Sequence, residues 1–166
     1  MVTTFEQLYT PEILRLAAEI PDCPLVTDAA YRVRVSSPIC GSDLILTLDF
    51  DGDGRVTRYG HKLMACAFGQ ASVSLFARSI LGALPHEVTQ AGDALALMLA
   101  GVNDGATAGD KALPDRQLRD GSTPHGPLPE GLWTGFEALR PVIAYGPRHG
   151  AVMLPFKAYR QALTSP

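Results

Sequence analysis

The sequence predicts an α+β chain in which a three-stranded antiparallel sheet is accompanied by helices. Three segments between residues 31 and 64 alternate apolar and polar side chains, as half-buried strands do. The segments before and after them repeat apolar side chains at helical spacing. The chain has 166 residues, of which 46% are hydrophobic and 19% charged, enough for one domain with its own core. We therefore expect a single domain spanning residues 1–166.

Composition and charge narrow the function classes. A net charge of −3 gives no electrostatic case for binding nucleic acid, which usually meets a basic patch. The longest strongly apolar stretch, residues 94–102, is too short to span a bilayer, and the N-terminus carries no secretory signal pattern. We expect a cytoplasmic protein that binds neither nucleic acid nor membrane. Its three cysteines are then expected to be free or metal-bound rather than paired in disulfides.

The first half of the chain supplies a helix and the sheet. Residues 5–20 have a helical pattern, and Thr10 followed by Pro11 is a good N-cap and first-turn pair that offers an alternative start. Alternation of apolar and polar residues predicts strands over 31–37, 43–50 and 55–64. Short connections between them favour an antiparallel meander.

The link between the second and third strands reads D-G-D-G. Asp and Gly tolerate positive φ, so this sequence is a strong hairpin signal. It also matches the start of a calcium loop, D-x-D-x-D-G, beginning at Asp49. Such a loop needs a bidentate Glu at its twelfth position, where this chain has Gly60. A hairpin is therefore predicted in place of a calcium site.

Helices dominate the second half. The apolar spacing predicts a helix over 66–84, another from Pro85 to near Gly101, a short one over 131–140 and a last one over 151–163. Residues 102–130 are rich in Gly, Pro and Asp. This stretch is predicted to be a loop-rich insert, because too little chain follows it to form a second core.

Two cysteines are placed where a thiol is activated. Cys40 lies in a Gly-containing turn before the second strand, and Cys66 opens the helix after the third. Both placements lower the pKa of a thiol, and the meander returns both to one end of the sheet. Two thiolates are too few for a closed metal site, which takes four ligands. Candidates for the remaining ligands are Asp43, His149, His61 and Cys23. At this point a metal site and a pair of buried structural cysteines are equal alternatives.

Several sequence blocks together carry a family resemblance. They are L-Y-T-P-E-I-L near the N-terminus, S-P-I-C-G-S-D-L-I-L around Cys40, D-G-D-G-R-V-T in the hairpin, A-C-A-F-G-Q-A-S-V-S-L-F around Cys66, and F-E-A-L-R-P-V-I-A-Y-G-P-R-H-G-A-V-M-L-P-F-K-A-Y near the C-terminus. The second block is similar to the pattern P-x-C-G-D, and the fourth, the most specific, to G-C-x-I-x-x-A-S-x-S. In these features the chain resembles the IscU/SufU/NifU-N family of iron–sulfur cluster assembly scaffolds.

The resemblance implies a SufE/NifU-like sandwich, in which helices cover the three-stranded sheet, and a scaffold or carrier that is not an enzyme. In the family, three cysteines and one aspartate hold zinc or a nascent cluster and receive sulfur from a cysteine desulfurase. Cys40 and Cys66 correspond to the first two cysteines. The aspartate position is occupied by Ser42, and the third cysteine position by Ala151.

The predicted site therefore combines two cysteines that match family ligands with two nearby residues that take the place of the missing ones. We expect Cys40 and Cys66 to bind iron or a nascent iron–sulfur cluster, with Asp43 and His149 as further metal ligands. The resemblance implies a cysteine desulfurase and apo-protein acceptors as partners, with the chain as a monomer or homodimer. One alternative is a SufU-like zinc-dependent sulfur acceptor, a sulfurtransferase role that the insert at 102–130 favours. The other is a non-metal relative that keeps both thiols for packing and acts as an interaction protein.

Overall fold

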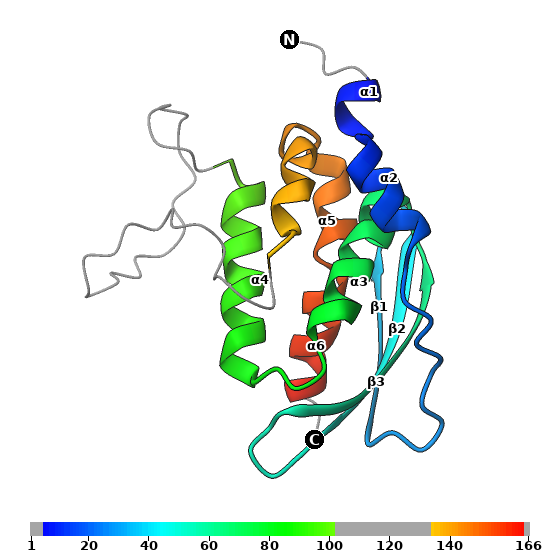
Figure 1. The fold of residues 1–166 in the computed structure, drawn as a ribbon, viewed down its shortest axis with the longest axis vertical. Coiled ribbons are helices and arrows are strands. Elements are labelled where there is room, and N and C mark those ends of the chain that lie inside the picture. Colours follow the sequence, from blue (N-terminus) through cyan, green and yellow to red (C-terminus); the bar gives the residue numbers. More distant parts are fainter. Residues whose placement is uncertain (1–4, 102–133, 165–166) are drawn as a thin grey trace, which may run out of the picture.

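The fold combines one small sheet with a layer of helices. The structure is a computed structural model that describes residues 5–101 and 134–164. A three-stranded antiparallel sheet is packed with helices, which confirms the predicted α+β class (Figure 1). The insert predicted at 102–130 lies outside the described residues. Among the helices that are described, none is long and apolar enough to cross a membrane.

The sheet is a meander with the strand order β1-β2-β3. Its strands are β1 (Tyr31–Ser37), β2 (Ser42–Phe50) and β3 (Val56–Met64). The register pairs Ser37 with Ser42 across the first hairpin, and Asp43 with Met64 across the second. The β1–β2 turn and the chain that leaves β3 therefore lie at the same end of the sheet. This register brings the segments that carry Cys40 and Cys66 to one end of the molecule.

The D-G-D-G sequence forms the predicted hairpin. The Asp51 side chain accepts hydrogen bonds from the backbone N–H groups of Asp53 (3.0 Å) and Arg55 (2.8 Å). Gly54 has a φ of 82°, in the left-handed region that favours glycine. The carboxylate thus closes the turn, as aspartate commonly does in tight turns.

The helices are α1 (Phe5–Leu8), α2 (Pro11–Ala18), α3 (Ala67–Ser79), α4 (Pro85–Leu99), η1 (Phe136–Ala144), η2 (Gly146–Arg148), α5 (His149–Val152) and α6 (Leu154–Thr164). Thr10 caps α2, because its Oγ1 accepts a hydrogen bond from the Ile13 N–H at 3.3 Å; the alternative start is therefore the correct one. The helix predicted over 66–84 ends earlier, at Ser79, and the left-handed Gly82 turns the chain toward α4.

Two predictions about the C-terminal helices need correction. The short helix predicted over 131–140 is the 3₁₀ helix η1, which runs from Phe136 to Ala144 and contains Pro141. A proline inside an α-helix removes a backbone hydrogen bond and clashes with the preceding turn, which favours another geometry. The predicted last helix over 151–163 is divided at Met153 into α5 and α6.

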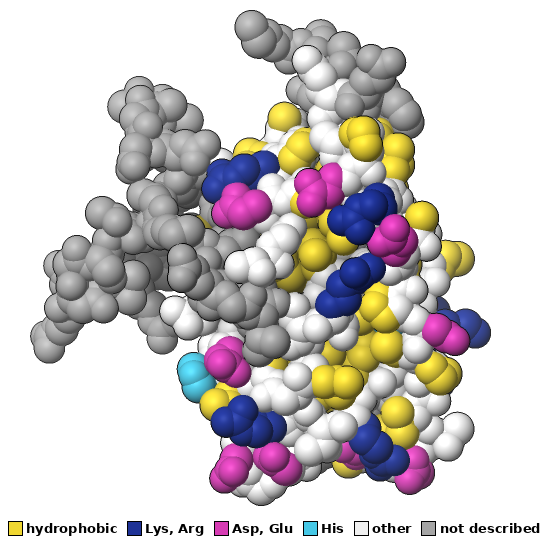
Figure 2. All heavy atoms as spheres, in the orientation of Figure 1, with side chains coloured by type: hydrophobic (Ala, Val, Ile, Leu, Met, Phe, Trp, Pro, Cys, Tyr) yellow, Lys and Arg dark blue, Asp and Glu magenta, His cyan; other side chains and the backbone are white. Residues whose placement is uncertain are grey.

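One face of the sheet is covered by helices, and the segment before β1 covers part of the opposite face, where Thr47 is fully buried and its Oγ1 accepts a hydrogen bond from the Val26 N–H at 3.0 Å. Helix α6 packs on β1 and β2, while α3 packs on α2 and β3. Leu44, Leu46 and Leu48 of β2 point into this core and are buried. Charged side chains of both signs are interspersed over the described part of the face shown in Figure 2, in keeping with the small net charge of −3.

Candidate metal centre

Cys40 lies in the turn between β1 and β2. Gly41 follows it with a φ of 66°, which lets the chain reverse tightly. The Cys40 thiol hydrogen-bonds to Ser42 Oγ at 3.1 Å and to the Ser37 carbonyl at 3.8 Å. Ser37 and Ser42, at the two ends of the turn, are both buried, whereas Cys40 between them is only partly buried.

The surroundings of Cys40 favour its thiolate. Burial raises the pKa of this thiol, but hydrogen bonding with Ser37 and Ser42 and the positive charge of Arg148 together outweigh it, so the pKa lies below its ordinary value. In the ionised state the Ser42 hydroxyl and backbone N–H can both donate to the sulfur. The direction agrees with the activated thiol predicted from the sequence.

Arg148 is a site residue that the sequence analysis missed. It ends η2, and its guanidinium lies 5.9 Å from the centre of the Tyr145 ring. Its Nε is buried and has no hydrogen-bond partner in the described part of the chain. The neighbouring Gly150 approaches β1 so closely that an added Cβ would lie 2.5 Å from Ser37 Oγ. This contact brings residues 148–150, where η2 meets α5, to the turn that carries Cys40. In the sequence, the only indication of this role was that a charged residue stands next to the candidate ligand His149.

Cys66 is the N-cap residue of α3. Its backbone is extended, with φ −67° and ψ 168°, and its side chain makes no capping hydrogen bond. The sulfur is partly buried. Ala151 packs on the first turn of this helix, because a Cβ built on Gly69 would lie 3.4 Å from the Ala151 Cβ. Ala151, which the sequence resemblance aligns with the family's third cysteine, therefore lies against the helix that Cys66 opens.

Asp43 is not directed toward the thiols. Its carboxylate accepts hydrogen bonds from Arg34 Nε at 3.0 and 3.1 Å. In β2 it alternates with the buried residues Ser42 and Leu44, so it lies on the opposite face of the sheet. The pairing with Arg34 holds it there.

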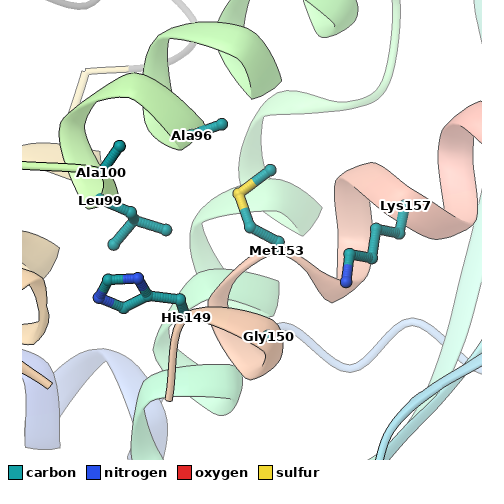
Figure 3. Close-up of a pocket in the computed structure, with 7 residues that line it drawn as sticks. All are labelled: Ala96, Leu99, Ala100, His149, Gly150, Met153 and Lys157. Atoms are coloured by element: carbon teal, nitrogen blue, oxygen red, sulfur yellow. The ribbon is translucent and has the colours of Figure 1, made fainter. Parts of the chain in front are cut away.

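His149 also faces another environment. Its Nε2 lies 3.0 Å from the Val142 carbonyl and 3.2 Å from the Ile143 carbonyl, so this nitrogen carries the proton and donates. The ring borders a pocket of about 260 Å³ that is also lined by α4 and by Met153 and Lys157 (Figure 3). The imidazole thus faces α4.

The other two candidate ligands lie at the edge of β3. The Cys23 carbonyl accepts a hydrogen bond from the His61 N–H at 2.8 Å, and the His61 ring lies 5.5 Å from the Tyr59 ring. Within the described ranges, no group of three or more His, Cys, Asp or Glu side chains could hold a metal ion. The structure therefore brings the two thiol-bearing segments together but does not assemble the predicted four-ligand set of Cys40, Cys66, Asp43 and His149.

The same fold occurs in solved structures of other proteins. A nitrogen-fixing NifU-like protein (N-terminal) from Brucella abortus matches with a TM-score of 0.76 and 28% identity, over 95% of this chain and 93% of that chain. This likeness confirms the resemblance to the IscU/SufU/NifU-N family. A putative iron–sulfur cluster assembly scaffold protein for the SUF system from Fervidobacterium islandicum AW-1 matches with a TM-score of 0.72 and 18% identity, over 97% of this chain and 100% of that chain. No family model matches the sequence, and no curated protein matches it.

Within the IscU/SufU/NifU-N fold, this end of the molecule combines two soft sulfur donors with a cation. Thiolates select iron–sulfur clusters, iron and zinc over hard ions such as Mg²⁺. Arg148 adds a positive charge beside Cys40, which favours anionic sulfur species near it. The arrangement suits an open, two-thiol site better than a closed tetrahedral zinc site.

Proposed function

We propose that this chain is an iron–sulfur cluster assembly scaffold or carrier that binds iron or a nascent cluster through Cys40 and Cys66. One observation carries the proposal: a chain with the fold of a NifU-like N-terminal domain has a thiol on each of two segments that meet at one end of its sheet. Cysteine thiolates are the usual ligands of iron–sulfur clusters. The iron or cluster is cargo here, and the chain acts as its carrier, not as an enzyme.

The residues around Cys40 support a loading role. A lowered pKa increases the fraction of thiolate at neutral pH, and only the thiolate binds iron. The Arg148 charge partly offsets the negative charge that sulfide and thiolates bring to the site. Partial exposure of both sulfurs leaves them open to a sulfur donor and to acceptors. A cysteine desulfurase as donor and apo-proteins as acceptors suit this chemistry.

Anaerobic reconstitution with ferric iron and sulfide tests the proposal. The protein should gain visible absorption from sulfur-to-iron charge transfer, and both Cys40→Ser and Cys66→Ser should abolish it. Cys23→Ser is the matched control, because Cys23 lies at the β3 edge, and it should retain the absorption. A protein that stays colourless under strict exclusion of oxygen would contradict the proposal.

A gain-of-ligand variant tests the position of Ala151. Ala151→Cys places a thiol against the first turn of α3, so the variant should retain iron through a desalting step better than the parent chain. Ala158→Cys, which adds a thiol at an equally buried alanine of α6, should give no gain. If the two variants retain iron equally, position 151 does not belong to the site.

A SufU-like zinc-dependent sulfur acceptor is the second candidate, favoured by the likeness to the scaffold of a SUF system. Zinc sites take four ligands, whereas Asp43 is paired with Arg34 and His149 donates to carbonyl groups. Metal analysis of the purified protein would reveal about one zinc per chain if this candidate held. In an interaction protein without metal, Cys40 and Cys66 would resist alkylation in the folded, chelator-treated chain.

A further inference from the structure

The two edges of the sheet differ in how their backbones are paired. The order β1-β2-β3 leaves β1 and β3 as the edge strands (Figure 1). The outer edge of β3 is occupied at two places along the strand. The Val56 N–H donates to the Ala83 carbonyl at 3.2 Å, and the His61 N–H donates to the Cys23 carbonyl at 2.8 Å. An edge that is covered in this way is protected against pairing with a further strand.

The outer edge of β1 has no such cover among the described residues. The backbone hydrogen bonds of β1 go to β2 along the whole register. Helix α6 packs on one face of the strand, and α5 meets its end, where Gly150 approaches Ser37. Over residues 31–36, no backbone group outside β2 in the described ranges pairs with the strand. Such an edge presents unpaired N–H and C=O groups to which one more strand can add.

The side chains along this edge are basic on one face and apolar on the other. Arg32 and Arg34 alternate with buried Val33 and are exposed on the outer face of the sheet. The Arg34 side chain stays 72% exposed although it pairs with Asp43, and Arg32 makes no ion pair within the described part of the chain. On the inner face, Tyr31 is only partly buried against the core. A strand that suits this edge carries acidic side chains on one face and apolar side chains on the other.

We propose that the β1 edge binds an extended, acidic segment of a partner protein as an additional strand. Backbone hydrogen bonds to β1 hold the segment, its carboxylates lie beside Arg32 and Arg34, and its alternate apolar side chains cover Tyr31. The inference goes beyond the proposed function, because it uses neither the thiols nor a metal. Since β1 leads into the turn that carries Cys40, the bound segment runs along the strand toward the thiol end of the sheet.

A second copy of the chain is disfavoured as the occupant of this edge. Two copies that pair antiparallel through β1, about a two-fold axis at Val33, place Arg32 of each copy opposite Arg34 of the other. Like charges that lie directly opposite each other destabilise a pair of strands. An acidic segment meets the same two side chains with the opposite charge, so charge complementarity selects it over self-pairing.

The test is titration of the whole chain with a short, capped peptide that alternates glutamate and valine, followed through amide NMR shifts. We expect saturable binding, with the shifts concentrated in residues 31–36, and no binding of a matched lysine–valine peptide. N-methylation of one alternate set of peptide amides should abolish binding, and N-methylation of the other set should not, because only one set faces β1.

Three outcomes of the titration would overturn the inference. The first is a glutamate–valine peptide that does not bind, or that shifts amides away from β1. The second is binding that survives N-methylation of either set of amides, since the contact is then electrostatic without strand pairing. The third is a shift of the 31–36 amides with protein concentration in the absence of peptide, which would assign the edge to a second copy.

A charge reversal on β1 separates this edge from the rest of the surface. Arg32→Glu should weaken binding of the glutamate–valine peptide by about fivefold, because it replaces a cross-strand attraction with a repulsion. Lys62→Glu is the matched control: Lys62 is exposed on the same outer face but belongs to β3, whose edge is covered, so affinity should change by less than about twofold. Unfolding midpoints of both variants should match the parent, since both side chains are exposed. Equal weakening by the two variants, or none by Arg32→Glu, would contradict the proposal.

Discussion

Ser72 links α3, the helix that begins after Cys66, to α5, the short helix that contains Ala151. It is fully buried in α3, and its Oγ donates to the Val152 carbonyl of α5 at 2.6 Å. Ser72→Ala removes this donor in surroundings that water does not reach. A net hydrogen bond is worth about 1 kcal/mol and an unsatisfied buried carbonyl costs about 1–3 kcal/mol. We expect the variant to lose about 2 kcal/mol of unfolding free energy.

Ser74→Ala is the matched control on the same helix. Ser74 is equally buried, and its Oγ donates to the Glu19 carbonyl at 3.3 Å. That carbonyl also accepts from Arg78 Nη2 at 2.7 Å, so it keeps a charged donor when Ser74 is truncated. The expected loss is about 0.5 kcal/mol, measured like the first by urea unfolding. We reason that the destabilisation comes mainly from leaving the Val152 carbonyl without a donor, and less from the loss of the hydrogen bond itself. Equal losses of unfolding free energy in the two variants would refute this reasoning.

Three further predictions concern the edge of the sheet. A Cβ on Gly60 would lie 2.2 Å from the Pro24 carbonyl oxygen, so Gly60→Ala should lower the unfolding free energy by about 2 kcal/mol or more. As the control, the Cβ of Gly52→Ala meets nothing within 4 Å and should change the unfolding free energy by less than about 0.5 kcal/mol. Similar losses in the two variants would contradict the close packing of the Pro24 loop on β3. Tyr59→Phe removes a buried hydroxyl without a hydrogen-bond partner among the described residues, so urea unfolding should show unchanged or slightly higher stability. A loss above about 1 kcal/mol would show that this hydroxyl is bonded. Burial lowers the pKa of His61 below 6.5 against the opposing charge of Asp22, so the unfolded chain binds this proton first as the pH falls. His61→Gln should therefore reduce the stability loss that begins near pH 6.5, and superimposable pH–stability curves for variant and parent would count against it.

Local sequence patterns determined most of the backbone. The period of two in residues 31–37 and 43–50 predicted strands because half-buried strands expose alternate side chains. The D-G-D-G turn and the Thr10–Pro11 pair marked element boundaries through local hydrogen bonds and φ preferences. These signals act within a few residues, so they can be read without knowing what packs against the chain. The same holds for the placement of Cys40 before a strand and Cys66 before a helix.

The composition of the site depended on tertiary structure. Ser42 and Asp43 are adjacent in sequence, yet one faces the core and the other pairs with Arg34, because successive strand residues point to opposite faces. The carbonyls that hold His149 come from Val142 and Ile143 in the last turn of η1, beyond the end of the short helix predicted over 131–140.

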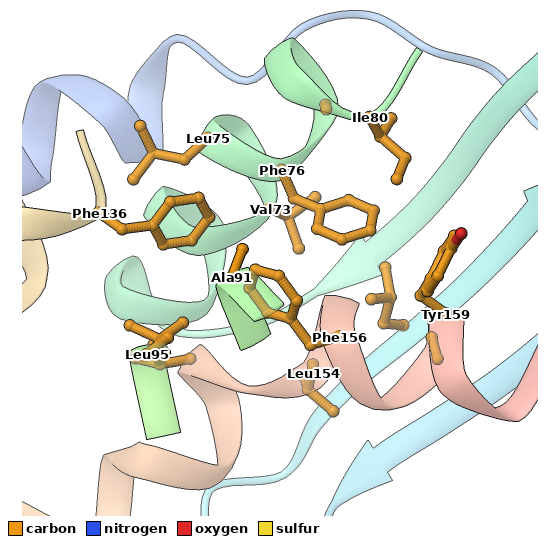
Figure 4. Packing of buried hydrophobic residues seen from close by; sticks show 14 of the residues in the cluster. Val73, Leu75, Phe76, Ile80, Ala91, Leu95, Phe136, Leu154, Phe156 and Tyr159 are labelled. Atoms are coloured by element: carbon orange, nitrogen blue, oxygen red, sulfur yellow. The ribbon is translucent and has the colours of Figure 1, made fainter. Parts of the chain in front are cut away.

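The core shows the same dependence on long-range packing. Phe156 meets Phe76 at 5.2 Å and Phe136 at 5.5 Å between ring centres, joining segments far apart in the chain (Figure 4). This packing, with the Gly150 contact to Ser37, sets where the 148–151 corner lies. The sequence by itself therefore determined the strands, the hairpin and the two thiols. Only the folded chain decided that Arg148 approaches Cys40 while Asp43 and His149 face elsewhere, because those positions depend on contacts between residues distant in sequence.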